Sequence, residues 1–139
     1  MAQLRGTVLV VDDEAPILAV LRRFLTKAGY NVVVAPNGEA ALQLVHTGPL
    51  PDLIVLDLMM PVMSGFEVLS ALRVNEDWAN IPVIVLTATM GYSTDHLQVD
   101  ALLEKPFDVE DVEAAIQAAL ERRRKKKGTA KKRKRTKQR

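Results

Sequence analysis

The sequence predicts an α/β fold in a single domain: a doubly wound sheet of five parallel strands with helices on both faces. Five short apolar or β-branched runs alternate with segments of helical periodicity, which is the order that produces parallel strands joined by right-handed crossovers. The run at residues 53–56 is apolar at every position, which suits a strand covered by helices on both faces. A chain of 139 residues is long enough to bury such a core without cross-links.

The strands are separated by recognisable helix starts and turns. We expect helices to begin near Pro16, Asn37, Ser64 and Asp108, because proline suits a first helical turn and short polar side chains cap it. Between residues 88 and 100 the pattern weakens, and we expect a loop with at most a short helix. The expected strands are residues 7–11, 30–35, 53–56, 81–86 and 101–103.

The charge is distributed very unevenly along the chain. Residues 122–139 hold 13 of the 19 lysines and arginines and no acid, so the first 121 residues carry all 17 acids against six basic residues. We therefore divide the chain into an acidic domain, residues 1–121, and a basic tail, residues 122–139. The end of the tail has no apolar residue beyond Ala130, and we expect it to be disordered when free.

Composition excludes several classes of protein. There is no cysteine, which rules out disulfides and thiolate metal sites. No apolar run approaches the length of a membrane span, so we expect a cytoplasmic protein without membrane insertion. No glycine-rich G-x-G-x-x-G sequence follows the first strand, which excludes a nicotinamide dehydrogenase.

Polar side chains stand where four of the strands end. Asp12 and Asp13 follow the first strand, Asp57 the third, Thr87 the fourth and Lys105 the fifth. The carboxyl ends of parallel strands share one edge of the sheet, where ligands bind in open α/β folds. Clustered carboxylates without histidine or cysteine suit Mg²⁺ rather than zinc. A lysine and a hydroxyl can hold phosphoryl oxygens, which would make Asp57 the nucleophile of phosphoryl transfer to a carboxylate.

Four motifs in this order resemble the receiver domain of two-component response regulators over residues 5 to about 121. They are Val-Val-Asp-Asp-Glu at residues 10–14, Asp-Leu-Met-Met-Pro at 57–61 with Gly65, Thr-Ala at 87–88 and Lys-Pro-Phe at 105–107. The resemblance implies a flavodoxin-like sheet and a stand-alone, chemotaxis-regulator-like protein with no output domain.

The resemblance also implies a chemical role for each matching residue. Asp57 would accept a phosphoryl group from a phosphohistidine of a sensor histidine kinase or phosphotransfer protein. Asp13 would bind Mg²⁺ directly and Asp12 largely through water, while Asp57 and the main-chain carbonyl of Met59 complete the protein ligands. The protein would catalyse only its own phosphorylation and dephosphorylation.

The remaining implied positions surround the phosphoryl group. Thr87 and the main-chain amide of Ala88 would hold phosphoryl oxygens, and Lys105 would pair with the phosphate. The Lys105–Pro106 bond resembles the cis peptide of the family. Thr87 and Leu102 form the expected switch region, although the family usually has an aromatic residue at the position of Leu102.

The basic tail leaves the choice of output open. It could bind DNA, RNA or an acidic protein by counterion release, or fold back on the acidic domain. An alternative function is a nucleic-acid-binding protein on a silent receiver fold, with binding carried by the tail. A second alternative, an aspartyl-phosphate phosphohydrolase, is disfavoured because such enzymes commonly have an acid at the position of Met59. Dimerisation is not decided by the sequence.

Overall fold

The computed structural model describes residues 4–88 and 97–137, and of residues 127–137 it describes the backbone only. Within these ranges strands and helices alternate as far as the fourth strand. Their bounds are β1 (Thr7–Val11), α1 (Ala15–Lys27), β2 (Asn31–Ala35), α2 (Gly38–Thr47), β3 (Leu53–Asp57), α3 (Gly65–Val74), β4 (Val83–Thr87), β5 (Ala101–Glu104) and α4 (Val109–Lys137).

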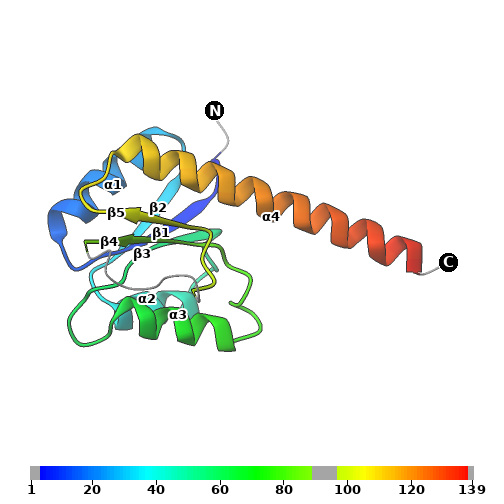
Figure 1. The fold of residues 1–139 in the computed structure, drawn as a ribbon, viewed down its shortest axis with the longest axis horizontal. Helices are drawn as coiled ribbons and strands as arrows, with labels where there is room; N and C mark the ends of the chain where they lie inside the picture. Colours follow the sequence, from blue (N-terminus) through cyan, green and yellow to red (C-terminus); the bar gives the residue numbers. More distant parts are fainter. Residues whose placement is uncertain (1–3, 89–96, 138–139) are drawn as a thin grey trace.

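The five strands form one parallel sheet in the order β2-β1-β3-β4-β5. Figure 1 shows α1 and α4 on one face of the sheet and α2 and α3 on the other. The predicted doubly wound α/β fold is therefore confirmed. In the register of the sheet Val11 lies beside Leu56 and Asp57 beside Leu86, so the carboxyl ends of β1, β3 and β4 meet at one edge.

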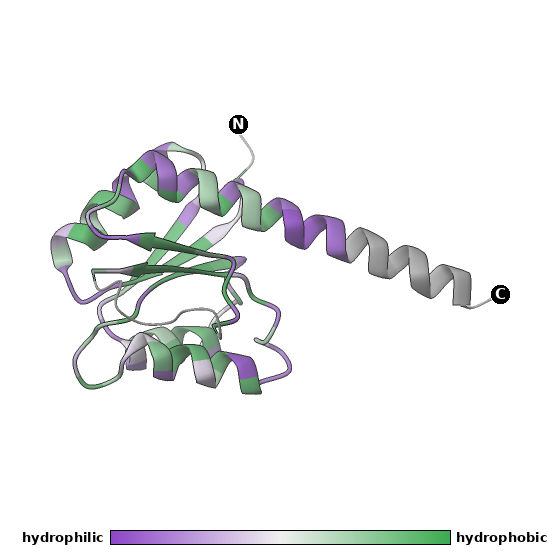
Figure 2. Cartoon of the chain, in the orientation of Figure 1, coloured by the Kyte–Doolittle hydropathy of each residue, from purple (hydrophilic) through white to green (hydrophobic). Residues whose placement is uncertain are grey.

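Each face of the sheet has its own apolar layer. Leu21 and Ile116 belong to the layer beneath α1 and α4, and Val45 and Leu72 to the layer beneath α2 and α3. All five residues of β3 and all five of β4 are buried, because both strands are covered on both sides. This explains why their apolar runs are continuous rather than alternating. Figure 2 shows the strands as mostly hydrophobic ribbons between the helices.

The predicted helix starts are found in the structure. The side chain of Asn37 accepts a hydrogen bond from the amide of Ala40 at 2.8 Å, and that of Ser64 accepts one from the amide of Glu67 at 3.3 Å. Both contacts satisfy amides that have no partner within the helix. Pro16 lies in the first turn of α1, where its missing N–H leaves no hydrogen bond unmade.

Two expectations, for the start of β4 and for the segment between β4 and β5, fare differently. β4 begins at Val83 rather than at residue 81, although the carbonyl of Pro82 still accepts a hydrogen bond from the amide of Ile54 at 3.0 Å. Proline has no N–H to give to the ladder, which explains the later start. The loop expected at residues 88–100 falls largely outside the described residues, since only its ends are described, and residues 97–100 there form no helix.

The basic residues continue the last helix. Figure 1 shows α4 projecting beyond the sheet toward the C-terminus, and its backbone is helical to Lys137, where the sequence predicts a disordered segment. Lysine, arginine and alanine all favour helix, and the packed turns of α4 supply the nucleus from which it extends. The division of the chain at residue 121 and the disorder of the free tail stay predictions.

Candidate functional site

Three carboxylates meet at the carboxyl edge of the sheet. Asp12 follows β1 directly and is fully buried, Asp57 ends β3 and is 3% exposed, and Asp13 is exposed. One oxygen from each of these carboxylates lies within 4.8 Å of the other two. Among the described residues this is the one such group of acidic or histidine side chains that could hold a metal ion. Its donors are all oxygen, which fits a hard divalent cation such as Mg²⁺.

Short turns orient the two buried carboxylates. One oxygen of Asp12 accepts a hydrogen bond from the amide of Glu14 at 2.8 Å. One oxygen of Asp57 accepts a hydrogen bond from the amide of Met59 at 3.2 Å. Each aspartate thus bonds to the backbone two residues further on, a local pattern that fixes the side chain as the strand ends. The second oxygen of each faces Lys105, whose Nζ lies 2.8 Å from Oδ2 of Asp12 and 3.4 Å from Oδ2 of Asp57.

Lys105 supplies the positive charge of the site. Its Nζ lies 2.8 Å from Asp12, 2.8 Å from Glu14 and 3.4 Å from Asp57. The Lys105 amide donates to the carbonyl of Thr87 at 2.8 Å, and the following Lys105–Pro106 peptide is cis, as the sequence resemblance implies. Burial alone would lower the pKa of Lys105, but its bonds to Asp12 and Glu14 raise that pKa well above its ordinary value.

Asp57 is a costly carboxylate for the folded protein to bury. Burial and, after it, the neighbouring Asp12 carboxylate raise the pKa of Asp57 to about 6, against the opposing effect of Lys105. At neutral pH Asp57 is ionised beside a second buried carboxylate. Such an arrangement favours the arrival of a further cation, or a reaction that converts Asp57 into another group.

The other residues predicted for the site differ in how exposed they are to solvent. Thr87 ends β4 and is 1% exposed, beside the strand that ends in Asp57, and Ala88 follows it as an exposed residue. Met59 is exposed, two residues beyond Asp57. Leu102 lies within β5, two register positions before the residue paired with Thr87, and packs against the apolar layer of α2 and α3.

Two residues acquire a place in the site that was not predicted for them. Glu14 shares Lys105 with Asp12, although only its position in the first motif drew notice to it. Gly65, at the start of α3, donates its amide to the carbonyl of Leu58 at 2.9 Å. A Cβ atom there would overlap the main-chain carbonyl of Asp57 and lie 2.6 Å from the Cα of Leu58. A glycine at a helix start, where it weakens the helix, was the available signal.

Comparison with known proteins agrees with this arrangement. The sequence profile of the response regulator receiver domain matches residues 8–117. The chain therefore belongs to the response regulator receiver family of two-component signal transduction. It is similar to the transcriptional regulatory protein KdpE of Mycobacterium tuberculosis, with 42% identity over 120 residues, which cover 83% of this chain and 51% of that protein. The DNA-binding dual master transcriptional regulator RpaA of Synechocystis is 41% identical over 120 residues, 83% of this chain and 49% of RpaA.

Solved receiver structures have the same fold. The chemotaxis protein CheY4 of Vibrio cholerae superimposes with a TM-score of 0.75 and 30% identity, covering 85% of this chain and 99% of that one. The response regulator TrrA of Thermotoga maritima, solved in complex with Mg²⁺ and BeF, gives a TM-score of 0.72 and 33% identity, covering 81% of this chain and 97% of that one. The chain spans about half the length of the curated relatives it matches. Within the described residues no helix is both long and apolar enough to cross a membrane.

We expect Asp57→Asn to stabilise the metal-free protein at neutral pH. Because the pKa of Asp57 is higher in the folded than in the unfolded chain, this carboxyl group lowers stability as the pH rises from about 4 to about 6. The variant should gain about 2 kcal/mol in urea unfolding at pH 7.5 with a chelator present, and nothing near pH 3.5.

The matched control is Asp77→Asn, an exposed aspartate in a distant turn, which should change stability little. Added Mg²⁺ should raise the stability of the native protein more than that of Asp57→Asn. A loss of stability in Asp57→Asn at pH 7.5 without metal would contradict this account of the site.

Gly65→Ala tests the close approach of α3 to the backbone that carries Asp57. The added methyl group meets main-chain atoms that cannot rotate away, so the free energy of unfolding should fall by at least about 2 kcal/mol. Ser70→Ala, at an exposed position of the same helix, serves as control and should stay within about 0.5 kcal/mol of the native protein. Equal stability of both variants in urea unfolding would show that the helix can move away without loss.

Proposed function

We propose that this receiver domain is a phosphorylation-dependent switch in which Asp57 accepts a phosphoryl group from a phosphohistidine of a sensor histidine kinase or phosphotransfer protein. The observation that carries the proposal is the convergence of Asp57, Asp12, Asp13 and Lys105 at the carboxyl edge of the sheet. A cluster of three carboxylates and one lysine does not by itself stabilise the fold, and it does not suit a purely apolar ligand. They suit a reaction in which phosphoryl charge is held and transferred.

The transfer step can be written with the groups present. A carboxylate oxygen of Asp57 attacks phosphorus, the new O–P bond forms, and the N–P bond to the donor histidine breaks. The electron pair of that bond returns to the imidazole nitrogen, which takes a proton from water. The product is an aspartyl phosphate, so an ionised Asp57 is required, and at neutral pH a pKa of about 6 leaves most of it ionised.

Lys105 and Thr87 would respond to the transferred group. Lys105 now pairs with Asp12, Glu14 and Asp57, and a phosphoryl oxygen offers its Nζ a stronger acceptor. The hydroxyl of Thr87 and the amide of Ala88 would donate to the other oxygens. Movement of these groups toward the phosphate would bias the adjacent loops between two arrangements, which is how a local charge becomes a signal.

The residues present fit a Mg²⁺ ion. Asp12, Asp13 and Asp57 would hold it, with the main-chain carbonyl of Met59 as a further ligand. When bound, the ion supplies positive charge against the developing charge on the phosphoryl oxygens. On this proposal the protein acts on no external substrate and catalyses only its own phosphorylation and dephosphorylation. Met59 stands where aspartyl-phosphate phosphohydrolases commonly have an acid, which supports this restriction.

The basic end of α4 is proposed to bind a polyanion. Residues 122–139, most of which lie in this part of α4, carry 13 basic residues without an acid, whereas the preceding domain is strongly acidic. DNA is the polyanion that the similarity to DNA-binding regulators favours, and an acidic protein is the alternative. The same observation supports a second candidate function. In it the receiver is not phosphorylated, and the basic tail alone binds nucleic acid. The cytoplasmic location expected from the sequence belongs to both proposals.

Phosphorylation is tested with a small-molecule phosphodonor, phosphoramidate, in the presence of Mg²⁺. Mass spectrometry should show one phosphoryl group on the native protein and none on Asp57→Asn, because the variant has no nucleophilic carboxylate. Asp77→Asn, which changes the same functional group far from the site, should be labelled like the native protein. Full labelling of Asp57→Asn would overturn the assignment of Asp57.

Binding of a generic DNA duplex should be steeply salt-dependent. Between about 50 and 200 mM salt we expect the affinity to fall by at least about a hundredfold, because bound counterions are released from the DNA. A chain ending at Lys126 keeps the contacts of Arg122 and Arg123 with the domain but lacks eight of the 13 basic residues, and should lose most of this binding.

The phosphate mimic beryllofluoride with Mg²⁺ separates the two candidate functions. If the receiver controls the basic segment, the mimic should change the DNA affinity of the native protein but not that of Asp57→Asn. Binding that is the same in both proteins, with and without the mimic, would favour the silent receiver. No binding near physiological salt would reject DNA as the polyanion.

A further inference from the structure

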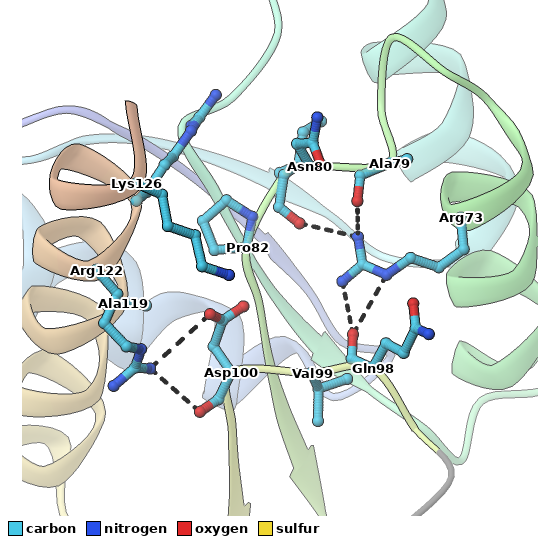
Figure 3. A pocket seen from close by; sticks show the side chains of 12 residues that line it. Arg73, Ala79, Asn80, Pro82, Gln98, Val99, Asp100, Ala119, Arg122 and Lys126 are labelled. Atoms are coloured by element: carbon cyan, nitrogen blue, oxygen red, sulfur yellow. Dashed lines mark hydrogen bonds and ion pairs between the residues drawn. The ribbon is translucent and has the colours of Figure 1, made fainter. Parts of the chain in front are cut away.

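A cavity of about 530 Å³ lies at the edge of the sheet opposite Asp57. Its floor is made by the residues that lead into β4 and β5, including Pro82 and Val99. Figure 3 shows Arg73 reaching into it from α3, and Arg122 and Lys126 from α4 on the other side. Because the strands are parallel, this edge carries none of the groups assigned to phosphorylation. Its volume is in the range of sites for small molecules.

The lining of this cavity is strongly basic on a domain that is otherwise acidic. Four cationic side chains and one carboxylate, that of Asp100, face it. Asp100 is already engaged, since it accepts a hydrogen bond from the amide of Val83 at 3.0 Å and lies 3.8 Å from Arg122. The four cations are Arg73, Arg122, Arg123 and Lys126.

Arg73 is a fixed charge without a carboxylate in contact. It donates to the carbonyls of Ala79 and Ile81 at 2.8 and 3.1 Å. It also donates to the carbonyl of Gln98, at 2.7 Å from Nη2. Carbonyl acceptors hold the guanidinium in place but do not neutralise it. Among the described residues no acid lies within 4.0 Å of the Arg73 guanidinium, and its Nη2 donates one hydrogen bond, to Gln98.

The opposite wall continues the inward face of α4. Ile116 and Ala119 pack on the sheet, and the same three- and four-residue spacing next places Arg123 and Lys126 on this face. Arg123 donates to the carbonyl of Asp52 at 2.8 Å, while its Nε is buried and finds no acceptor in the described part of the chain. Lys126 is exposed and makes no hydrogen bond or ion pair with any described residue.

We propose that this cavity binds a small molecule that carries two or more linked phosphate groups. Donors stand on both walls and acceptors are few, so the ligand must be anionic and long enough to reach from α3 to α4. Guanidinium groups match phosphate oxygens with paired N–H donors, and a lysine adds a mobile charge. The apolar floor at Pro82 and Val99 could accommodate a nucleoside attached to the phosphates. The proposal does not depend on phosphorylation of Asp57.

The experiment uses the full chain and two sources of linked phosphates, inorganic tripolyphosphate and ATP, without Mg²⁺ and at about 150 mM salt, which screens weak long-range attraction. Amide NMR should show saturable shifts at Asn80 and at residues 98–100, while the amides of residues 12, 13 and 57 stay unchanged. Tighter binding of ATP would show that a nucleoside occupies the floor, and equal binding would identify polyphosphate itself as sufficient.

Two pairs of variants distinguish binding in the cavity from general attraction to the basic tail. Arg122→Gln and Lys126→Gln remove charges that line the cavity, whereas Arg124→Gln and Lys125→Gln remove the same charges from exposed neighbours that do not line it. The first pair should weaken tripolyphosphate binding about tenfold each, and the second pair less than about twofold.

Three results would overturn the proposal. Equal weakening by both pairs would show diffuse attraction to the basic segment rather than a site. Shifts that do not saturate would show that no site exists. Citrate, a carboxylate of similar charge, should bind more weakly, and tighter binding of citrate would refute the phosphate assignment. Lys126→Gln keeps the test decisive even if Arg122→Gln disturbs Asp100, because Lys126 supports no described contact.

Discussion

The register of the parallel sheet is the constraint on which the site depends. Val11 beside Leu56, and Asp57 beside Leu86, align the ends of β1, β3 and β4, so three strands deliver their last polar residues to one point. A slip of one residue in β3 would reverse the faces of its side chains and separate the carboxylates. The core resists such a slip, because a slip in either direction would bring Asp52 or Asp57 to a position that a buried leucine, Leu53 or Leu56, now fills. The same strand register therefore determines both the stability of the core and the geometry of the acidic cluster.

Much of the architecture could be predicted because local patterns agreed with the tertiary structure. The strand at residues 53–56 was evident from its apolar run, and the caps at Asn37 and Ser64 from their side chains. Parallel topology then placed Asp12, Asp57, Thr87 and Lys105 at one edge without any knowledge of distances. What sequence could not supply was the pairing among these groups. Glu14 joins Lys105 across 91 residues, and no spacing along the chain indicates that contact.

The basic end of the chain shows a second feature that could not be predicted from residue composition. Treated as a charge run, residues 122–139 appear as one tail, but Arg122 and Arg123 bond to the carbonyls of Asp100 and Asp52. Helical periodicity continues past Leu120, the last residue of α4 that packs on the apolar layer, and turns these charges toward the domain. The basic cavity arises from that continuation, since its other wall comes from α3. Neither wall indicates a site on its own, and only the fold places Arg73 opposite α4.

Because α4 is one unbroken helix from Val109 to Lys137, the packing of its first half sets the rotational phase of its second half. Val112, Ile116 and Ala119 fix the angle of the helix about its own axis against the sheet. The rest of the helix keeps that rotation, because each residue is turned by about 100° about the helix axis from the residue before it. The direction in which Arg122, Arg123 and Lys126 present their charges is thus decided in the core. Insertion of a single alanine after Glu121 would leave the charge unchanged, yet would rotate the helix beyond it by about 100° relative to the sheet.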